Sequence, residues 1–262
     1  MSSCNCPHQF KNFEFHRTNK KSCIFAAMNP KLVIFDLDGT LLNTIDDLRE
    51  AVNYAMTLRG FPTYTRNEIM TMVGHGIRNL VINALPTEHK DDTAIVEAAL
   101  DDFTAYYKAH IDVHTRPYPG MQELTERLHQ EGVFMAVASN KFQEGTEYLV
   151  KKFFPNIPFV AILGNRPGFP LKPDPEIVGE VLRRSGIKRE NAVMVGDSPT
   201  DMKTAENGGI TGIAVGWGYR DMKDIANWGI GPSTPFDKLR DRSGTEFHLV
   251  KTAEELQKTL LP

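Results

Sequence analysis

Four aspartates stand just beyond apolar runs of this 262-residue chain, where buried strands are expected to end. Asp36 and Asp38 follow the run Leu32–Phe35, and Asp197 and Asp201 follow a later run. If these strands are parallel, their carboxyl ends meet at one edge of a sheet and the four acids converge. Like charges a few ångströms apart raise one another's pKa unless a cation intervenes. A hard divalent cation removes this conflict, and Mg²⁺ is the expected ion where phosphate is also bound.

Ser139 and Lys172 are the expected partners of that phosphate. Ser139 follows another apolar run, Lys172 precedes a helix predicted to begin near Pro175, and both are expected at helix N-terminal ends. A hydroxyl, an ammonium and the backbone N–H groups of such ends are natural donors to phosphate oxygens. Acids, Mg²⁺, a lysine and a serine together indicate phosphoryl transfer. One aspartate attacks phosphorus, and a second protonates the leaving oxygen and then activates water.

Several of these residues also have a purely structural interpretation. The segment from Ser198 to Asp201 has the pattern of a helix N-terminus, with a proline at the first helical position and an acid in the first turn. Asp201 can therefore cap a helix and still orient a metal-bound water. Asn140 either caps a helix or contacts substrate, and both interpretations stay open. Lys172 could otherwise be a solvated loop lysine.

Apolar, β-rich runs alternate with amphipathic helical stretches along the chain. Most runs lack polar alternation, as strands covered on both faces should. This pattern predicts an α/β fold with a doubly wound, mostly parallel sheet, which is a Rossmann-like core. The expected strands are Leu32–Phe35, Val133–Ala138, Phe159–Leu163, Ala192–Val195, Ile213–Val215 and Phe247–Val250.

The interval from Asp38 to Tyr118 contains no convincing strand and predicts an inserted α-helical cap domain. Thr44 and Thr65 each begin a capping-box pattern, and apolar residues at helical spacing follow both. A third helix is expected over roughly residues 91–110. The predicted division is a catalytic core of residues 30–43 and 117–262, a cap of residues 44–116, and a disordered N-terminal extension of residues 1–29.

The composition is that of an ordinary globular protein, with 41% hydrophobic and 24% charged residues. A formal net charge of -3 argues against a broad nucleic-acid-binding face, and no apolar run approaches the roughly 18 residues of a membrane span. All three cysteines lie in the first 23 residues, which excludes a disulfide framework for the fold and favours a reducing, cytoplasmic location. The expected partner is a small phosphorylated metabolite, and the oligomeric state stays open.

The segments that contain the four aspartates, Ser139 and Lys172 together resemble the four motifs of the haloacid dehalogenase superfamily of phosphohydrolases. The resemblance covers about Lys31 to Leu261, and the order and spacing of the motifs fit. The insert is similar to the mobile cap of the phosphoglycolate phosphatase-like branch. The matching segments are DLDGT from Asp36, SN from Ser139, Lys172, and GDSPTD ending at Asp201.

The resemblance implies a role for each matching residue. Asp36 would be the nucleophile and a Mg²⁺ ligand. Asp38 would be the general acid/base, with its backbone carbonyl also on the metal. Ser139 and Lys172 would hold the transferring phosphoryl group. The remaining pair would serve the metal, Asp197 as a ligand and Asp201 as a ligand or a support for one.

The same branch has a cap loop facing the active site, and the segment from Val73 to Arg78 resembles it. Gly74 and Gly76 would let the backbone approach substrate, while His75 or Arg78 could meet a substrate carboxylate. A helix-breaking turn with a solvated arginine is an equal alternative. The chain departs from the branch at Arg166, where smaller or acidic residues are expected, and Arg166 could contact substrate.

The leading hypothesis from the sequence is Mg²⁺-dependent hydrolysis of a small phosphomonoester through an aspartyl-phosphate, with 2-phosphoglycolate as the best single substrate. The nearest alternative is a phosphomutase of the β-phosphoglucomutase type, which shares the motifs. A phosphonate hydrolase fits less well, because no lysine lies between Ile45 and Leu85. A non-catalytic phosphate-binding module is a further alternative, although every catalytic position is filled. A nicotinamide-binding domain is set aside, since no Gly-x-Gly-x-x-Gly follows the first strand.

Overall fold

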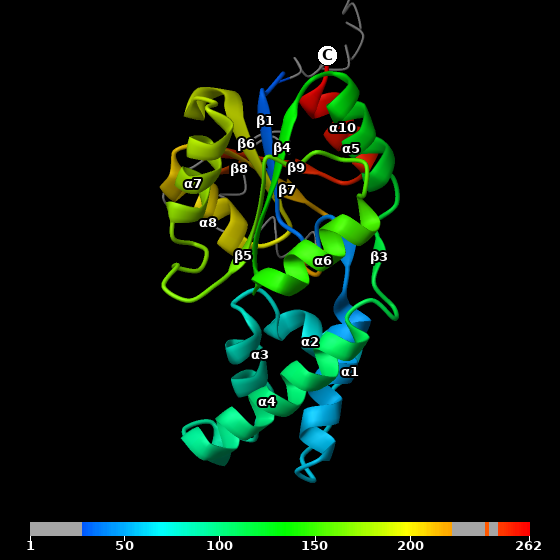
Figure 1. Ribbon diagram of the computed structural model, residues 1–262, viewed down its shortest axis with the longest axis vertical. Coiled ribbons are helices and arrows are strands. Elements are labelled where there is room, and N and C mark those ends of the chain that lie inside the picture. The colour runs from blue at the N-terminus through cyan, green and yellow to red at the C-terminus, as the bar shows by residue number, and fades with distance from the viewer. Residues whose placement is uncertain (1–27, 222–238, 241–245) are drawn as a thin grey trace, which may run out of the picture.

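A twisted seven-stranded sheet forms the centre of the molecule (Figure 1). The computed structural model describes residues 28–221, 239–240 and 246–262. The strands lie in the order β5-β4-β1-β6-β7-β9-β8, and all neighbours are parallel except β8 and β9. Their bounds are β1 Leu32–Phe35, β4 Phe134–Phe142, β5 Ala161–Asn165, β6 Ala192–Gly196, β7 Thr211–Val215, β8 Leu239–Arg240 and β9 Glu246–Val250.

Helices cover both faces of this sheet, as the unbroken apolar runs require. On β1, Val33 and Phe35 pack into one cluster with residues of α5, α6 and α10, whereas Leu32 and Ile34 pack into another with residues of α7 and α8. The predicted doubly wound α/β class is thereby confirmed. The helices are α5 Met121–Gln130, α6 Gln143–Phe153, α7 Glu176–Ser185, α8 Pro199–Gly208 and α10 Ala253–Leu260, with a 3-10 turn, η2, at Arg189–Asn191.

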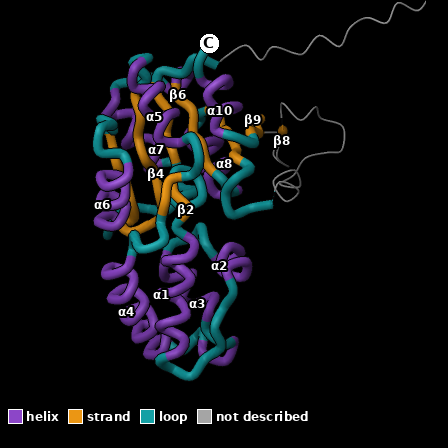
Figure 2. Tube along the Cα trace, turned by 90° about the vertical axis from the view of Figure 1, so that its right-hand side faces the viewer, coloured by secondary structure: helices purple, strands orange, loops and turns teal. Residues whose placement is uncertain are grey.

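A helical insert, α1 to α4, lies beyond the carboxyl edge of the sheet (Figure 2). The chain enters it through β2 and leaves through β3, which pair antiparallel. The elements are β2 Leu42–Asn43, α1 Ile45–Thr57, α2 Arg66–Met72, α3 Ile77–Ala84, η1 Thr87–His89, α4 Thr93–His110 and β3 Arg116–Pro117. Of these, α3 is absent from the sequence expectations, because Gly74 and Gly76 break the pattern just before it.

The two predicted capping boxes have different outcomes. At Thr65 both hydrogen bonds of the box are present, with Glu68 as its partner. At Thr44 the prediction is wrong, because this side chain makes no capping bond and donates instead to Asp38 (Oγ1–Oδ1 2.7 Å). The acid expected in the box, Asp47, accepts from the backbone of His114 and Thr115. Both residues therefore fix the junction between core and insert.

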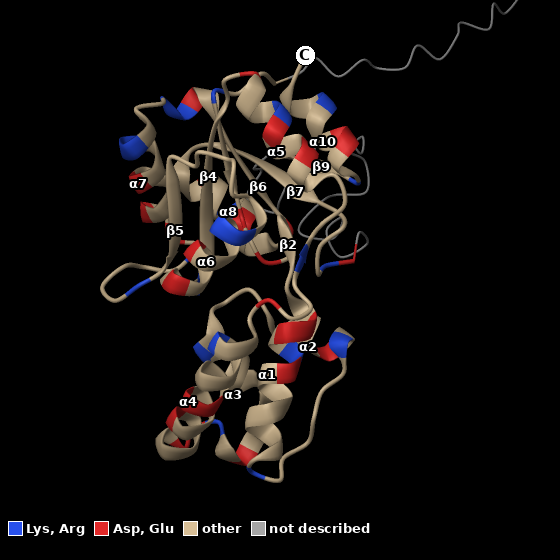
Figure 3. Cartoon of the chain, turned by 45° about the vertical axis from the view of Figure 1, so that its right-hand side comes forward, with Lys and Arg blue, Asp and Glu red and all other residues tan. Residues whose placement is uncertain are grey.

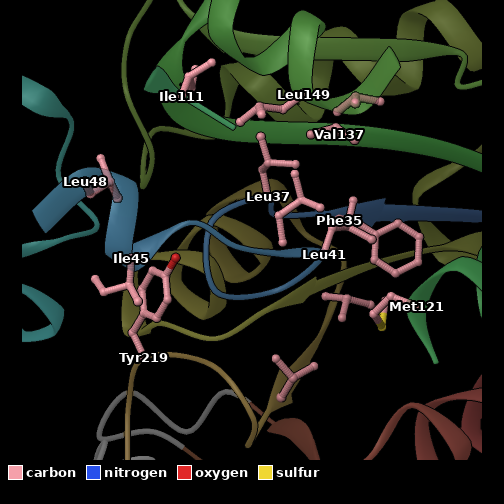
Figure 4. Close-up of a cluster of buried hydrophobic side chains, with 14 of the residues drawn as sticks. Phe35, Leu37, Leu41, Ile45, Leu48, Ile111, Met121, Val137, Leu149 and Tyr219 are labelled. Carbon is pink, nitrogen blue, oxygen red and sulfur yellow. The ribbon is translucent and has the colours of Figure 1, made fainter. Parts of the chain in front are cut away.

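One apolar cluster runs without interruption from the sheet into the insert (Figure 4). Phe35 and Leu37 lie at the sheet end, and Ile45 and Leu48 continue the cluster along α1, with Tyr219 beside Ile45. This continuity fixes how α1 leaves the core. Over the described ranges no helix combines the length and apolarity that crossing a membrane requires. The predicted disorder of residues 1–29 falls, up to residue 27, outside the described part of the chain.

Candidate active site

Three buried carboxylates meet at the carboxyl edge of the sheet. Asp36 follows β1, Asp197 follows β6, and Asp201 lies in the first turn of α8. One oxygen of each lies within 4.8 Å of the others. Lys172 enters this cluster from the loop before α7, and its Nζ donates to Asp36 at 2.7 Å and to Asp201 at 2.6 Å. The structure thus brings together three predicted acids and the predicted lysine from three separate segments.

Burial and mutual repulsion shift the pKa values of this cluster. Burial raises the pKa of Asp36 well above its ordinary value; Lys172 opposes the rise, and Asp201 and Asp197 add to it. Burial, followed by the charge of Asp201, raises the pKa of Asp197 to about 7, although the backbone N–H of Tyr219 counteracts the rise. Burial alone would lower the pKa of Lys172, but the charges of Asp201 and Asp36 outweigh it and raise that pKa. One lysine therefore does not neutralise three acids.

The donor set fits a hard divalent cation. Three carboxylates within reach of one point, with an excess of negative charge, are the ligands that Mg²⁺ accepts. Glycines leave the room that these acids occupy: a Cβ at Gly39 would come within 2.3 Å of the Asp197 carboxylate, and one at Gly218 within 2.3 Å of the Asp197 Cβ. Asp38 stands outside this cluster of acids, so its carboxylate has a different environment.

Added Mg²⁺ is expected to raise the unfolding temperature more at about pH 8 than at about pH 6. Asp197 has a pKa of about 7 in the folded protein against an ordinary value of 3.8. The metal-free folded state therefore holds an extra proton between these values, and its stability falls as the pH rises through this window. Above it, the ionised carboxylate can bind a cation without first losing a proton.

Thermal unfolding followed by circular dichroism, with and without MgCl₂ at both pH values, measures this difference. Asp197→Asn removes both the titrating group and a proposed ligand, so it should abolish most of the Mg²⁺ shift at both pH values. Equal Mg²⁺ shifts at both pH values in the wild type would contradict the prediction.

Asp38 is held by a buried lysine that the sequence reasoning did not single out. Lys141 Nζ lies 3.1 Å and 3.2 Å from the two oxygens of Asp38, and it also donates to the hydroxyl of Tyr107 on α4 at 2.6 Å. Thr44 donates to Asp38 Oδ1, and the hydroxyl of Tyr219 contacts both the backbone N–H and the Oγ1 of Thr44. The two motif acids thus sit two residues apart in separate settings, Asp36 against Lys172 and Asp38 against Lys141.

Ser139 and Asn140 differ from their expected placement. Ser139 does not begin a helix, because β4 continues irregularly to Phe142 and α6 starts only after it. Asn140 does not cap that helix either. Its amide donates to the carbonyl oxygens of Gly74 and Lys172, and its Oδ1 accepts from the Lys172 backbone N–H at 2.9 Å. Asn140 therefore fixes the lysine loop and touches the insert. Lys172 also lies upstream of α7 rather than at its N-terminus.

Asp201 forms the predicted helix cap and also belongs to the acid cluster. Its Oδ2 accepts from the backbone N–H of Ser198 at 3.1 Å and from the Ser198 hydroxyl at 2.6 Å, which completes a capping box at the start of α8. Its other oxygen, Oδ1, accepts from Lys172. One carboxylate thus anchors the helix with one oxygen and faces the acid cluster with the other.

A pocket opens between the acid cluster and the helical insert. Gly74 and Gly76 lie in its wall, as expected for the cap loop, but His75 and Arg78 do not. Arg78 pairs with Glu97 on the surface, where Figure 3 shows a basic turn of α3 beside acidic stretches of α4. The pocket is lined by Asp36, Asp38, Leu48, Val73, Gly74, Gly76, Ile77, Leu80, Ser139, Asn140, Lys141, Lys172, Asp197, Ser198, Tyr219 and Arg220.

Arg166, which departs from the family pattern, also lies outside this lining. Its guanidinium pairs with Glu180 on α7 and stacks on the ring of Phe169 at 3.7 Å. The contacts that it makes are therefore structural ones. Arg220, by contrast, lines the pocket, although it was not among the site residues predicted from the sequence.

Comparison with known proteins gives a consistent family match. The sequence model of the haloacid dehalogenase-like hydrolase family matches residues 33–215 of this chain. A phosphoglycolate phosphatase of Mesorhizobium japonicum is 33% identical, over 74% of this chain and 86% of its own length. One of Pseudomonas syringae pv. tomato is 34% identical, over 83% of this chain and 80% of its own length.

Solved structures match along nearly their whole length. A protein from Lactobacillus delbrueckii subsp. bulgaricus, whose own assignment as a phosphoglycolate phosphatase is a prediction, has a TM-score of 0.76 at 31% identity. The match covers 89% of this chain and 99% of that one. CbbY from Rhodobacter sphaeroides, solved in complex with phosphate, has a TM-score of 0.60 at 22% identity, covers 87% of this chain and 96% of that one, and supports the fold alone.

Proposed function

Because this chain belongs to the haloacid dehalogenase-like hydrolase family and is a phosphoric monoester hydrolase, we propose that it hydrolyses 2-phosphoglycolate to glycolate and phosphate with Mg²⁺. The family match supports the reaction class, and the names of the relatives support the substrate. The site supports phosphoryl transfer because its two motif acids, Asp36 and Asp38, lie in different surroundings. The placement of all cysteines before residue 24 is compatible with action in a reducing cytoplasm.

In the proposed reaction, a carboxylate oxygen of Asp36 attacks phosphorus while the bond to the leaving oxygen breaks. Asp38 gives its proton to that oxygen, so that glycolate departs as the alcohol. In the second half, Asp38 takes a proton from water, and the water oxygen attacks the phosphorus of the aspartyl-phosphate. The bond between phosphorus and the Asp36 oxygen breaks, which frees the Asp36 carboxylate and releases phosphate. Mg²⁺, held by Asp36, Asp197 and Asp201, would supply neutralisation of the charge on nucleophile and phosphate.

Lysine and serine complete the proposed phosphate site. Lys172 and Ser139 both line the pocket beside Asp36, and an ammonium and a hydroxyl can donate to phosphoryl oxygens. Asn140 would act indirectly, because its hydrogen bonds fix the backbone of Lys172. Gly74 would bring the backbone of the insert close to the substrate.

One observation carries the assignment of roles, namely the division of the two motif acids. Asp36 lies in the three-acid cluster, whereas Asp38 faces Lys141 and Thr44 outside it. Two carboxylates in different environments can divide nucleophilic and acid/base work between them. This division favours an enzyme over a phosphate-binding module without turnover.

A panel of small phosphomonoesters, assayed for released phosphate with Mg²⁺ and with chelator, tests the proposal. The expected result is turnover that requires Mg²⁺ and has its highest kcat/KM for 2-phosphoglycolate. Conversion of β-glucose 1-phosphate to glucose 6-phosphate, without release of phosphate, would indicate the mutase alternative. Failure to hydrolyse any phosphomonoester with Mg²⁺ present would refute the proposal.

A further inference from the structure

Three cations line the pocket, and Arg220 differs from the two lysines in its partners. Lys172 faces Asp36 and Asp201, and Lys141 faces Asp38. Arg220 donates only to neutral groups, the backbone carbonyls of Met70 and Val73. Within the residues that the structure describes, no carboxylate pairs with it. Its positive charge therefore remains available to a ligand in the pocket.

The loop before Arg220 is anchored firmly to the core. The backbone N–H of Tyr219 donates to Asp197 at 2.7 Å, and the Tyr219 hydroxyl contacts Thr44 at the entrance to the insert. Arg220 follows directly and reaches across to the last turn of α2 and the residue after it. Its charge is near enough to the acid cluster to lower the pKa of Asp197. The guanidinium thus lies where the core loop, the insert and the pocket meet.

The insert places a glycine, which has no side chain, next to this guanidinium. Gly74 lies beside it, and a Cβ at Gly74 would stand 3.8 Å from Nη2 of Arg220. A larger side chain on that Cβ would begin to cover the guanidinium. The carbonyls of Met70 and Val73 account for a donor on each of two nitrogens, and a guanidinium has five N–H donors in all. The remaining donors lie in the plane of the guanidinium and can donate to a carboxylate.

We propose that Arg220 binds a second anionic group of the substrate, a carboxylate, while its bonds to Met70 and Val73 hold the insert over the pocket. The proposal rests on the proposed hydrolase function and narrows it to phosphomonoesters that carry a carboxylate. It also moves the expected carboxylate contact from the insert to the core. Of the two residues that the sequence suggested for this contact, His75 lies outside the pocket lining, and Arg78 is paired with Glu97 away from the pocket.

A pair of substrates distinguishes binding of a carboxylate by Arg220 from a purely structural role, in which Arg220 only holds the insert in place. Hydrolysis of 2-phosphoglycolate and of ethyl phosphate, which lacks only the carboxylate, is compared in wild type and Arg220→Met. The ratio of their kcat/KM values should fall by about 10- to 100-fold, mainly through KM for 2-phosphoglycolate, because a hydrogen-bonded charge pair is lost. If Arg220 only holds the insert in place, the substitution should lower kcat/KM for both substrates by the same factor. That result would overturn the proposal.

Matched variants make the outcome specific. Arg220→Lys keeps the charge but not the fork, and it should retain part of the preference for the carboxylate. Arg127→Met removes an exposed arginine that pairs with Glu131 on α5, and it should leave the ratio unchanged. Arg78→Met tests the competing contact, and a selective loss there but not in Arg220→Met would overturn the proposal. Thermal unfolding of each variant verifies that it is folded.

The two levels of the proposal fail in different ways. A wild type that hydrolyses no phosphomonoester contradicts the hydrolase function itself, before any variant is measured. If the wild type hydrolyses ethyl phosphate as efficiently as 2-phosphoglycolate, the proposed hydrolase function stands, but the proposed carboxylate site is contradicted.

Discussion

Asp36→Asn should lower kcat by at least about 10⁴-fold while the metal-free protein unfolds no earlier than the wild type. The amide has nearly the same shape but is a much weaker nucleophile, so the aspartyl-phosphate cannot form at a useful rate. The stability expectation has a separate cause. Burial raises the pKa of Asp36, so its ionised form is disfavoured near Asp197 and Asp201. Removing one of three negative charges relieves that repulsion, and Lys172 keeps Asp201 as its partner.

Phosphate release under saturating substrate and thermal unfolding without Mg²⁺ provide the two readouts. Asp101→Asn, an exposed change on α4, is the matched control and should affect neither. An active Asp36→Asn variant would contradict the assignment of the nucleophile. An inactive variant that also unfolds far below the wild type would indicate loss of structure instead, and would contradict the expectation that its stability is retained.

Lys141→Met should lower kcat by roughly 10²-fold or more for substrates with poor leaving groups. Lys141 is almost completely buried and contacts both oxygens of Asp38. Without its ammonium, Asp38 loses the group that fixes its orientation, and a partly buried carboxylate is left with Thr44 alone. Proton delivery to the leaving oxygen should suffer, whereas attack by Asp36 on phosphorus involves other residues.

Substrates with different leaving groups distinguish a role of Lys141 in positioning Asp38 from a general loss of structure at the site. Ethyl phosphate needs a proton on its departing oxygen, whereas 4-nitrophenyl phosphate releases an anion that is already stable. The loss of kcat should therefore be much larger for ethyl phosphate. Lys151→Met, which removes an exposed lysine of α6, is the matched control. Equal losses on both substrates would show that Lys141 does not act through Asp38.

The parts of the site that the sequence predicts are those with a local signal. Asp36 ends a strand whose bounds, Leu32–Phe35, are the same in the prediction and in the structure. Asp197 follows another continuous apolar run, and the parallel order of β1 and β6 brings the two acids together. Apolar runs identify the strands. Because the carboxyl ends of parallel strands lie at the same edge of the sheet, the acids that follow these strands are predicted to lie together.

The parts that it could not predict depend on contacts between distant segments. Lys141 lies 103 positions from Asp38, and Arg220 lies 150 from Met70. No spacing rule relates such pairs. Asp38 and Lys141 meet because β1 and β4 are neighbours in the sheet, and Arg220 meets Met70 only where the insert packs on the core. Thr44 shows the same limit, since its pattern fits a capping box equally well. The side chain is used instead by Asp38 and Tyr219, which it meets only in the folded chain.

Asp47 and the β2–β3 ribbon make the insert exchangeable. Leu42 pairs with Pro117 and Asn43 with Arg116, so the chain leaves and re-enters the core at adjacent points. Asp47 ties the same two crossings together through the backbone of His114 and Thr115. A segment whose ends meet in this way can be replaced by another of different length without altering the strand order of the sheet. Changes of length within the insert can therefore alter the pocket wall that it supplies, while the strands that place the acids keep their order.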